Sequence, residues 1–153
     1  MKQLAWLLAS GFGVGTVPVA APGTVAAALA TLAGGGLMLV SPLVLPVAAC
    51  IAALVGLWAI AATVPADADP AWVVIDEVAG QWIALLGLAH PSAFGLLLAL
   101  GVFRLLDVVK PGPIGWADRQ GGAVGVMADD LIAGAFTAGI IWAVRTRWPY
   151  YFP

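Results

Sequence analysis

The sequence predicts an all-α membrane protein, a helical bundle with four to five membrane helices and a short helix at its N-terminus. Two observations support this prediction. Hydrophobic residues make up 63% of the 153 residues and charged residues only 9%, whereas soluble domains average about 45–50% and about 25%. So few charges cannot cover a soluble domain, and the apolar residues fall into long runs that suit lipid contact. We expect one domain covering residues 1–153.

A membrane-spanning helix needs about 20 mostly apolar residues. Polar or Pro-containing breaks leave five such segments, at 25–40, 43–64, 72–89, 92–109 and 129–144. Residues 110–128 are rich in Gly and Pro, which predicts a loop. The apolar run at residues 4–9 is too short to cross, so we expect an interfacial helix anchored by Trp6.

Five crossings would bring the polar segments 12–24, 65–77 and 104–130 to one membrane face. Positive residues favour the cytoplasmic side, and three of them mark this face as cytoplasmic: Lys2, Lys110 and Arg119. Arg145 and Arg147 near the C-terminus argue for the opposite orientation.

Two acidic pairs lie where membrane helices are expected to begin. These are Asp76-Glu77 and Asp129-Asp130. Acidic residues at a helix N-terminus also stabilise the helix dipole, which is the purely structural interpretation. Four carboxylates at one face repel each other, however, and a divalent cation would relieve the repulsion. Oxygen ligands suit Mg²⁺, Mn²⁺ or Ca²⁺, so these four residues are the candidate metal ligands.

Three further ionisable residues end the fourth apolar segment. Arg104, Asp107 and Lys110 are spaced three apart and are expected on neighbouring parts of one helix face. They could form a local ladder of ion pairs. The functional interpretation makes them catalytic, with Arg104 and Lys110 binding a phosphate and Asp107 acting as a metal ligand or as an acid/base group.

A Gly-rich stretch, Gly13-x-Gly15-Thr16-x-Pro18, precedes Pro22-Gly23-Thr24 and the first long apolar run. Such a loop before a helix can bind an anion, although Thr24 as a helix N-cap would explain the motif equally well. The chain has one cysteine, which excludes an internal disulfide or a cysteine-rich metal site, and no basic run that would indicate nucleic-acid binding.

Four blocks of residues together resemble the phosphatidylglycerophosphatase A family over nearly the whole chain. They are the loop ending at Thr24, Asp69-Pro70 with Val74-Ile75-Asp76-Glu77-x-x-Gly80, Phe103-Arg104-x-x-Asp107-x-x-Lys110-Pro111-x-Pro113-Ile114 followed by Asp118, and Gly125-Val126-Met127-x-Asp129-Asp130-x-x-Ala133-Gly134. The spacing of Pro18 and Pro22 departs from the family pattern by one residue.

The resemblance implies a Mg²⁺-dependent phosphatase of the bacterial inner membrane, with its active site on the cytosolic face. Its substrate would be the membrane lipid phosphatidylglycerophosphate, which it would hydrolyse to phosphatidylglycerol and phosphate. The resemblance adds Thr24 and Asp118 to the substrate-binding residues, beside Arg104 and Lys110.

Other interpretations remain open from the residues alone. The chain could hydrolyse another lipid phosphate, or its carboxylates could line an ion path in a transporter. A transporter predicts charges near the middle of the membrane, whereas these lie at the ends of the expected helices. The sequence does not assign the nucleophile, the base or the number of metal ions, and it leaves a homo-oligomer open.

Overall fold

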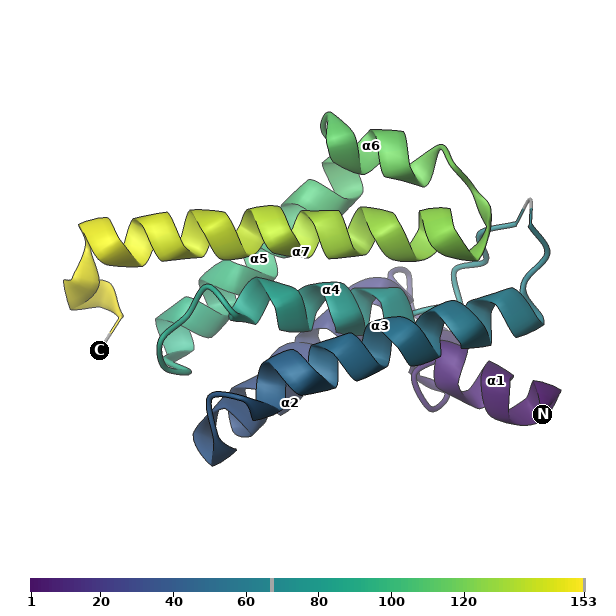
Figure 1. Ribbon diagram of the computed structural model, residues 1–153, viewed down its shortest axis with the longest axis horizontal. Coiled ribbons are helices and arrows are strands. Elements are labelled where there is room, and N and C mark those ends of the chain that lie inside the picture. The colour runs from purple at the N-terminus through teal and green to yellow at the C-terminus, as the bar shows by residue number, and fades with distance from the viewer. Residues whose placement is uncertain (67, 153) are drawn as a thin grey trace.

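A computed structural model describes residues 1–66 and 68–152, and within them the chain is all-α, as predicted (Figure 1). Seven α-helices follow one another: α1 (Lys2–Ala9), α2 (Pro22–Val40), α3 (Val44–Thr63), α4 (Ile75–Leu85), α5 (Ala93–Val109), α6 (Pro113–Asp118) and α7 (Gly122–Arg147). Two 3₁₀ turns cover Val14–Thr16 and Pro149–Tyr151. The described residues contain no strand.

Three helices, α2, α3 and α7, are long and apolar enough to cross a membrane. The expected span over 72–89 is reduced to α4, whose 11 residues extend about 16 Å. That is roughly half of the 30 Å hydrocarbon layer. The expected crossing at 92–109 corresponds to α5, with 17 residues. Four to five crossings are therefore not confirmed.

The prediction of a loop over 110–128 is wrong for most of that segment. Pro113 begins α6, where its fixed φ and missing N–H suit a first helical turn. Gly121 and Gly122 have φ values of 67° and 60°, and α7 starts directly at this turn. Asp129 and Asp130 therefore lie about two turns inside α7. Since the first turn of α7 holds no acidic residue, the helix-dipole explanation does not apply to this pair.

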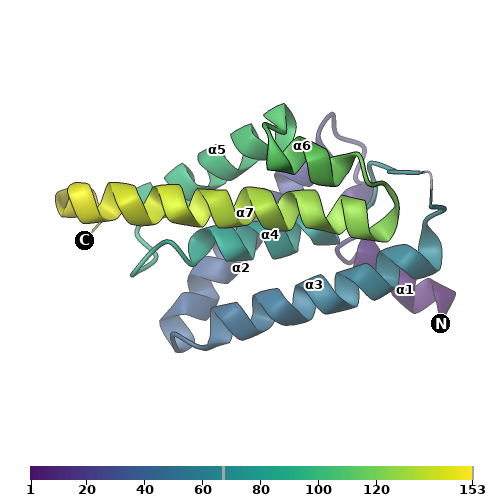
Figure 2. The same ribbon diagram turned by 45° about the horizontal axis from the view of Figure 1, so that its top comes forward.

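Helix α4 lies at the centre of the bundle and packs against α2, α3, α5 and α7 (Figures 1 and 2). Its contact with α7 depends on two glycines. A Cβ atom at Gly80 would lie 2.6 Å from the carbonyl oxygen of Asp130, and a Cβ at Gly134 would collide with the carbonyl oxygen of Gly80. These glycines let the two backbones touch, which membrane helices favour, and they bring the acidic residues of α4 and α7 together.

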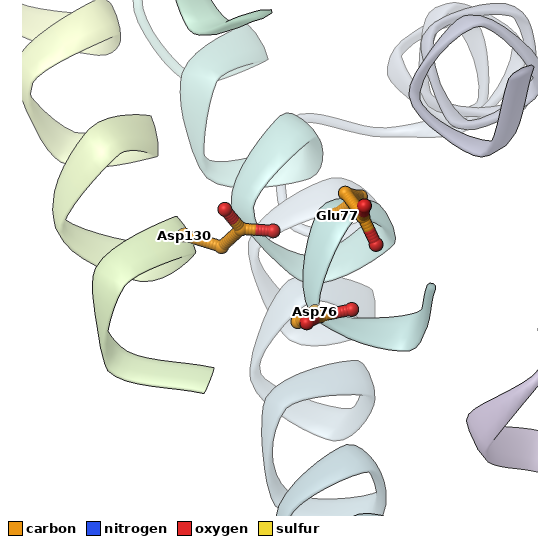
Figure 3. A group of neighbouring side chains, drawn as sticks. All are labelled: Asp76, Glu77 and Asp130. Atoms are coloured by element: carbon orange, nitrogen blue, oxygen red, sulfur yellow. The ribbon is translucent and has the colours of Figure 1, made fainter. Parts of the chain in front are cut away.

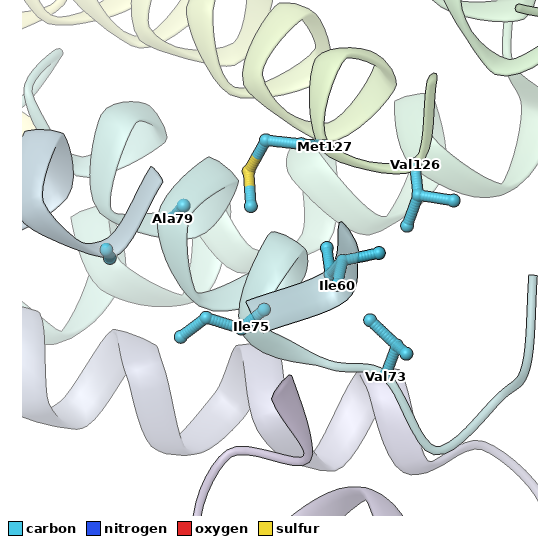
Figure 4. Packing of buried hydrophobic residues seen from close by; sticks show 7 residues of the cluster. Ile60, Val73, Ile75, Ala79, Val126 and Met127 are labelled. Atoms are coloured by element: carbon cyan, nitrogen blue, oxygen red, sulfur yellow. The ribbon is translucent and has the colours of Figure 1, made fainter. Parts of the chain in front are cut away.

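A hydrophobic cluster packs next to both acidic pairs (Figure 4). Ile75 of α4, Met127 of α7 and Ile60 of α3 pack together within it. Ile75 directly precedes Asp76, and Met127 lies two residues before Asp129. The positions of both acidic pairs are therefore set by apolar packing.

The expected N-terminal helix is present as α1, and it packs against α3. The indole rings of Trp6 and Trp72 lie 6.1 Å apart and join α1 to the segment before α4. Whether α1 lies in the membrane interface stays a prediction.

Candidate active site

The polar segments that the sequence places on one face meet at a single cavity of about 270 Å³. Its lining residues come from the start of α2, the segment before α4, the first turn of α4, the end of α5 and the buried part of α7. Seven of the predicted site residues line it: Asp76, Glu77, Arg104, Asp107, Lys110, Asp129 and Asp130. Thr24 and Asp118 do not line it.

One group of carboxylates joins α4 to α7. Asp76, Glu77 and Asp130 each offer an oxygen, and these three oxygens lie within 4.8 Å of one another. Figure 3 shows the Asp130 side chain extending from α7 toward the first turn of α4. Asp76 is only 7% exposed and Asp130 only 3%. The Oδ1 atom of Asp76 and the Oε2 atom of Glu77 are buried and have no hydrogen-bond partner, so both keep free lone pairs for a cation.

A second group joins α5 to α7 and shares one member with the first. Asp107, Asp129 and Asp130 also offer three oxygens within 4.8 Å of one another. Here Asp107 and Asp129 already have partners. The Oδ1 atom of Asp129 accepts a 3.0 Å hydrogen bond from the backbone N–H of Asp130, and basic side chains bind Asp107 and Asp129.

Arg104 lies between the two groups. Its Nη1 atom donates to Oδ2 of Asp107 at 2.5 Å and lies 3.8 Å from Oε1 of Glu77. The predicted Arg104–Asp107 pair along one helix face is thus present. Because the Arg104 side chain is 18% exposed, its guanidinium is shielded from water while remaining at the cavity wall.

Lys110 leaves the helix face on which the sequence predicted it. It caps α5 with a left-handed φ of 49°, a conformation that costs free energy for a side chain other than Gly. Its Nζ atom donates to Asp118 and, at 2.7 Å, to Oδ2 of Asp129. Burial lowers the pKa of Lys110, but the hydrogen bonds to these two carboxylates outweigh burial, so the pKa is raised above its ordinary value. Lys110 is therefore a permanent cation at the cavity.

The start of α2 closes the cavity. A Cβ atom at Gly23 would collide with Oε1 of Glu77 and lie 3.5 Å from Nη1 of Arg104, so a larger residue here would have to displace the Glu77 carboxylate. The prediction of Thr24 as N-cap is wrong. Helix α2 already begins at Pro22, its N-cap is Ala21 without a side-chain hydrogen bond, and Thr24 is an exposed residue of the first turn.

Comparison with known proteins identifies related sequences. The phosphatidylglycerophosphatase A family matches residues 7–145. The chain is 37% identical to phosphatidylglycerophosphatase A of Escherichia coli, over 94% of this chain and 84% of that protein. It is 31% identical to the Haemophilus influenzae protein of the same name, over 91% and 87%. No solved structure matches the chain.

The chain belongs to the phosphatidylglycerophosphatase A family. It is accordingly an enzyme, a phosphatase, and the expected resemblance is confirmed. A further relative is a Bacteroides thetaiotaomicron protein named provisionally as a phosphatidylinositol-3-phosphatase, 34% identical over 91% of this chain and 92% of that protein. The enzyme assignment decides against the transporter interpretation.

The structure of this phosphatidylglycerophosphatase A family member refines two of the predicted residues, Asp107 and Asp118, and shows one buried polar residue, Gln81, that the sequence did not single out. Asp107 joins Asp129 and Asp130 in one group, although the sequence left its role open. Asp118 contacts Lys110 and not the cavity. Gln81, one turn after Glu77 on α4, is completely buried with no hydrogen bond on its amide, and its spacing from Glu77 was the available signal.

Proposed function

We propose that this protein is a Mg²⁺-dependent phosphatase that hydrolyses the phosphate monoester of phosphatidylglycerophosphate, releasing inorganic phosphate and phosphatidylglycerol. Two relatives, 37% and 31% identical, carry the name phosphatidylglycerophosphatase A. The observation that carries the proposal is the cavity, in which buried carboxylates of α4 and α7 face two basic side chains of the α5 end. Phosphoryl transfer requires that combination of anionic metal ligands and cations for the phosphate.

We propose that Asp76, Glu77 and Asp130 hold the Mg²⁺ ion. Their oxygen donors suit Mg²⁺, and the free lone pairs of Asp76 and Glu77 support the assignment because buried polar atoms normally have a partner. Asp129 remains the proposed fourth ligand, with a smaller contribution since Lys110 occupies one of its oxygens. When bound, the ion would neutralise charge on the phosphate oxygens.

Arg104 and Lys110 are the proposed phosphate-binding residues. Both line the cavity, and both already bind carboxylates there. Asp107 is the proposed proton acceptor, since it lines the cavity beside Arg104. A water molecule attacks phosphorus and gives its proton to a carboxylate, the ester P–O bond breaks, and the lipid alcohol oxygen takes up a proton. Thr24 and Asp118 lie outside the cavity lining, so Asp118 would act only by holding Lys110.

The proposed location is the bacterial inner membrane, with the cavity on the cytosolic side. Helices α2, α3 and α7 would cross the bilayer. The shorter α4 and α5 would reach into the membrane from the two sides and meet α7 in the bundle. Of the basic residues expected on this face, Lys110 lines the cavity, and together with Lys2 and Arg119 it favours a cytosolic orientation.

One relative supports a second candidate substrate. The Bacteroides protein, 34% identical, is named for a phosphoinositide phosphatase. The two substrates share a phosphate monoester on a lipid headgroup and differ in the alcohol that leaves. The roles proposed for Arg104 and Lys110 concern the shared phosphate, and assaying the two lipids side by side distinguishes the headgroups.

Phosphate release by the purified protein in detergent tests the proposal. Vesicles or micelles containing phosphatidylglycerophosphate should yield phosphate in Mg²⁺ and none in excess EDTA. Phosphatidylinositol 3-phosphate, assayed in parallel at the same surface concentration, tests the second candidate. Full turnover in EDTA would refute the metal assignment, and turnover of the phosphoinositide alone would replace the proposed substrate.

A further inference from the structure

An apolar groove lies beside the cavity and has no part in the proposed chemistry. It has a volume of about 240 Å³ and is lined by the segment 11–14, by helices α2 and α4, and by Ala52 of α3. Among the described residues that line it, only Trp82 has a polar side-chain group, and its indole N–H already donates to the carbonyl of Ala30 at 2.9 Å. A polar ligand would lose its hydrogen bonds to water here without replacement, so the groove suits an apolar one.

The groove and the cavity share the first turn of α4. Asp76 and Glu77 line the cavity. Ile75 and Val78, the residues on either side of this pair, line the groove. A polar site and an apolar site are thus immediate neighbours on one helix, and a molecule with a charged part and an apolar part would fill both.

The groove leads away from the cavity along two helices. On α2, Gly23 lines the cavity, and the groove extends from Ala26 to Ala33. On α4, the groove extends from Ile75 to Trp82. Seven residues of helix cover about 10 Å in each case. Because α2 is proposed to cross the bilayer, the groove would run from the phosphate site into the hydrocarbon layer.

The segment 11–14 adds an exposed aromatic ring to the groove. Phe12 lines it although the residue is 74% exposed, and its φ is 58°. This left-handed conformation is disfavoured for a bulky side chain, and Gly11 and Gly13 on either side share it. A strained Phe that is largely exposed gains little from packing, which indicates a functional role. An apolar ligand in the groove would supply the missing contacts.

We propose that this groove, with Phe12 in its wall, holds one acyl chain of the lipid whose phosphate occupies the cavity. The inference rests on the proposed phosphatase function and adds how the enzyme recognises the lipid part of its substrate. In phosphatidylglycerophosphate, a glycerol and a phosphodiester separate the terminal phosphate from the acylated glycerol, so the chain is expected beside the cavity and not inside it. Lipid tails already surround a membrane protein. The groove therefore contributes by orienting the substrate.

A second apolar hollow is the alternative place for the chain. It has a volume of about 200 Å³ and lies between the end of α5, α6 and α7, where Phe136 and Ile140 line it. It is smaller than the groove, and Gly112 is the only described residue lining it that has a positive φ. The hollow thus contains no strained side chain that a ligand would stabilise.

Photolabelling tests the inference without turnover. The probe is a phosphatidylglycerophosphate analogue with a diazirine in one acyl chain and a phosphonate in place of the terminal phosphate ester, so that it binds without being hydrolysed. Phosphatidylglycerol with the same diazirine chain is the matched control, because it lacks only the terminal phosphate. With Mg²⁺ present, the phosphonate should label the α2 peptide that contains Leu29 and Ala33 several-fold more than the control does. Excess inorganic phosphate should remove the difference.

The outcomes of the labelling separate the groove from the proposed function. Equal labelling of α2 by the two probes would overturn the inference, and so would a difference confined to Phe136 and Ile140 of α7. If the protein releases phosphate from phosphatidylglycerophosphate in either case, the proposed function stands and only the groove is lost. A protein that neither releases phosphate nor distinguishes the two probes would fail the proposed function as well.

Two variants of α2 test the groove in turnover. Ala33→Phe places a ring at an exposed position that lines the groove, whereas Leu32→Phe places one at a position that is 70% exposed and does not line it. Ala33→Phe should lower kcat/KM for the lipid by about 10-fold, the lower end of what an apolar contact contributes to specificity, and Leu32→Phe should leave it unchanged. Inhibition by inorganic phosphate should match the wild type in both. An unchanged kcat/KM in Ala33→Phe would contradict the inference.

Phe12→Gly separates a functional role of this residue from a structural one. Glycine adopts a left-handed φ without strain, so the thermal midpoint in detergent should stay the same or rise. Labelling of α2 by the phosphonate and kcat/KM for the lipid should both fall several-fold, because the ring no longer contacts the chain. A lower midpoint with wild-type labelling would show that Phe12 serves only the fold, and it would overturn the proposed contact with the chain.

Discussion

The two carboxylate groups of the cavity share Asp130 but differ in their surroundings. In the first group, Asp76 and Glu77 keep buried oxygens without a partner, and the nearest cation is Arg104 at 3.8 Å from Glu77. In the second group, Asp107 and Asp129 each bind a basic side chain at 2.5 Å and 2.7 Å. Both groups offer carboxylate oxygens, but only in the second group are negative charges neutralised by basic side chains in direct contact.

This difference shows how one acidic cavity can bind a cation at one group of carboxylates and a phosphate at the other. A buried carboxylate without a counter-charge gains most from a cation, because desolvation makes its unpaired charge costly. A carboxylate already paired with Arg or Lys gains less. We therefore assign the ion to the first group, and we assign the phosphate, which competes for Arg104 and Lys110, to the second.

The largest effect should come from the residue that both groups share. Asp130→Asn removes a charge from each group at a position that is 3% exposed. We expect phosphate release to fall by about 10³-fold or more, at the upper end of single-group effects on charge stabilisation. Saturating Mg²⁺ should not restore it. Steady-state phosphate release over a Mg²⁺ titration checks this, and full rescue by Mg²⁺ would place Asp130 in the first group alone.

Arg104→Ala should affect the phosphate more than the metal. Removing a donor from a developing phosphate charge costs about 3–4 kcal/mol, or roughly 10²–10³ in kcat/KM. The Mg²⁺ concentration for half-maximal activity should stay nearly unchanged, because the first group retains its three carboxylates. If Arg104→Ala shifted only the Mg²⁺ requirement, the assignment of Arg104 to the phosphate and of the first group to the metal would be wrong.

A smaller effect, on stability, should follow from separating the two helices that carry the first group. Gly134 of α7 touches the backbone of Gly80, whereas Gly139, five residues further along the same helix, has open space around it. Gly134→Ala should lower the free energy of unfolding by about 1–3 kcal/mol through overpacking, and it should weaken Mn²⁺ binding.

Gly139→Ala is the matched control and should be neutral or stabilising, since Ala favours helix by about 1 kcal/mol over Gly. Thermal unfolding in detergent compares the two variants. Equal thermal midpoints would show that the close contact of α4 and α7 does not hold the site together.

Much of this site could be predicted from the sequence because charged residues are rare in an apolar chain. The two acidic pairs and the Arg104–Asp107 spacing stand out, and all four residues of the pairs line the cavity. The depth of Asp129 and Asp130 in α7 could not be predicted, because the glycines before them are typical of a loop. Gly121 and Gly122 make the turn, and the residues after them continue as helix.

The fold class was equally predictable, and the length of α4 was not. Its apolar residues extend from Trp72 to Ala89, but the helix covers only Ile75–Leu85. The Ala9 carbonyl accepts a hydrogen bond from the N–H of Val74, so a contact with α1, distant in sequence, holds the segment before α4 outside the helix. Hydropathy carries no information on such a contact.

The most direct test of the central claim compares Mn²⁺ binding by Asp76→Asn and Asp129→Asn, measured by electron paramagnetic resonance on folded protein in the same detergent. Both residues are buried acids, 7% and 4% exposed, and both substitutions remove one charge without changing shape. The account predicts that Asp76→Asn weakens Mn²⁺ binding by about 10- to 100-fold and that Asp129→Asn weakens it several-fold less, because Lys110 already compensates Asp129. An equal or larger loss in Asp129→Asn would contradict the account.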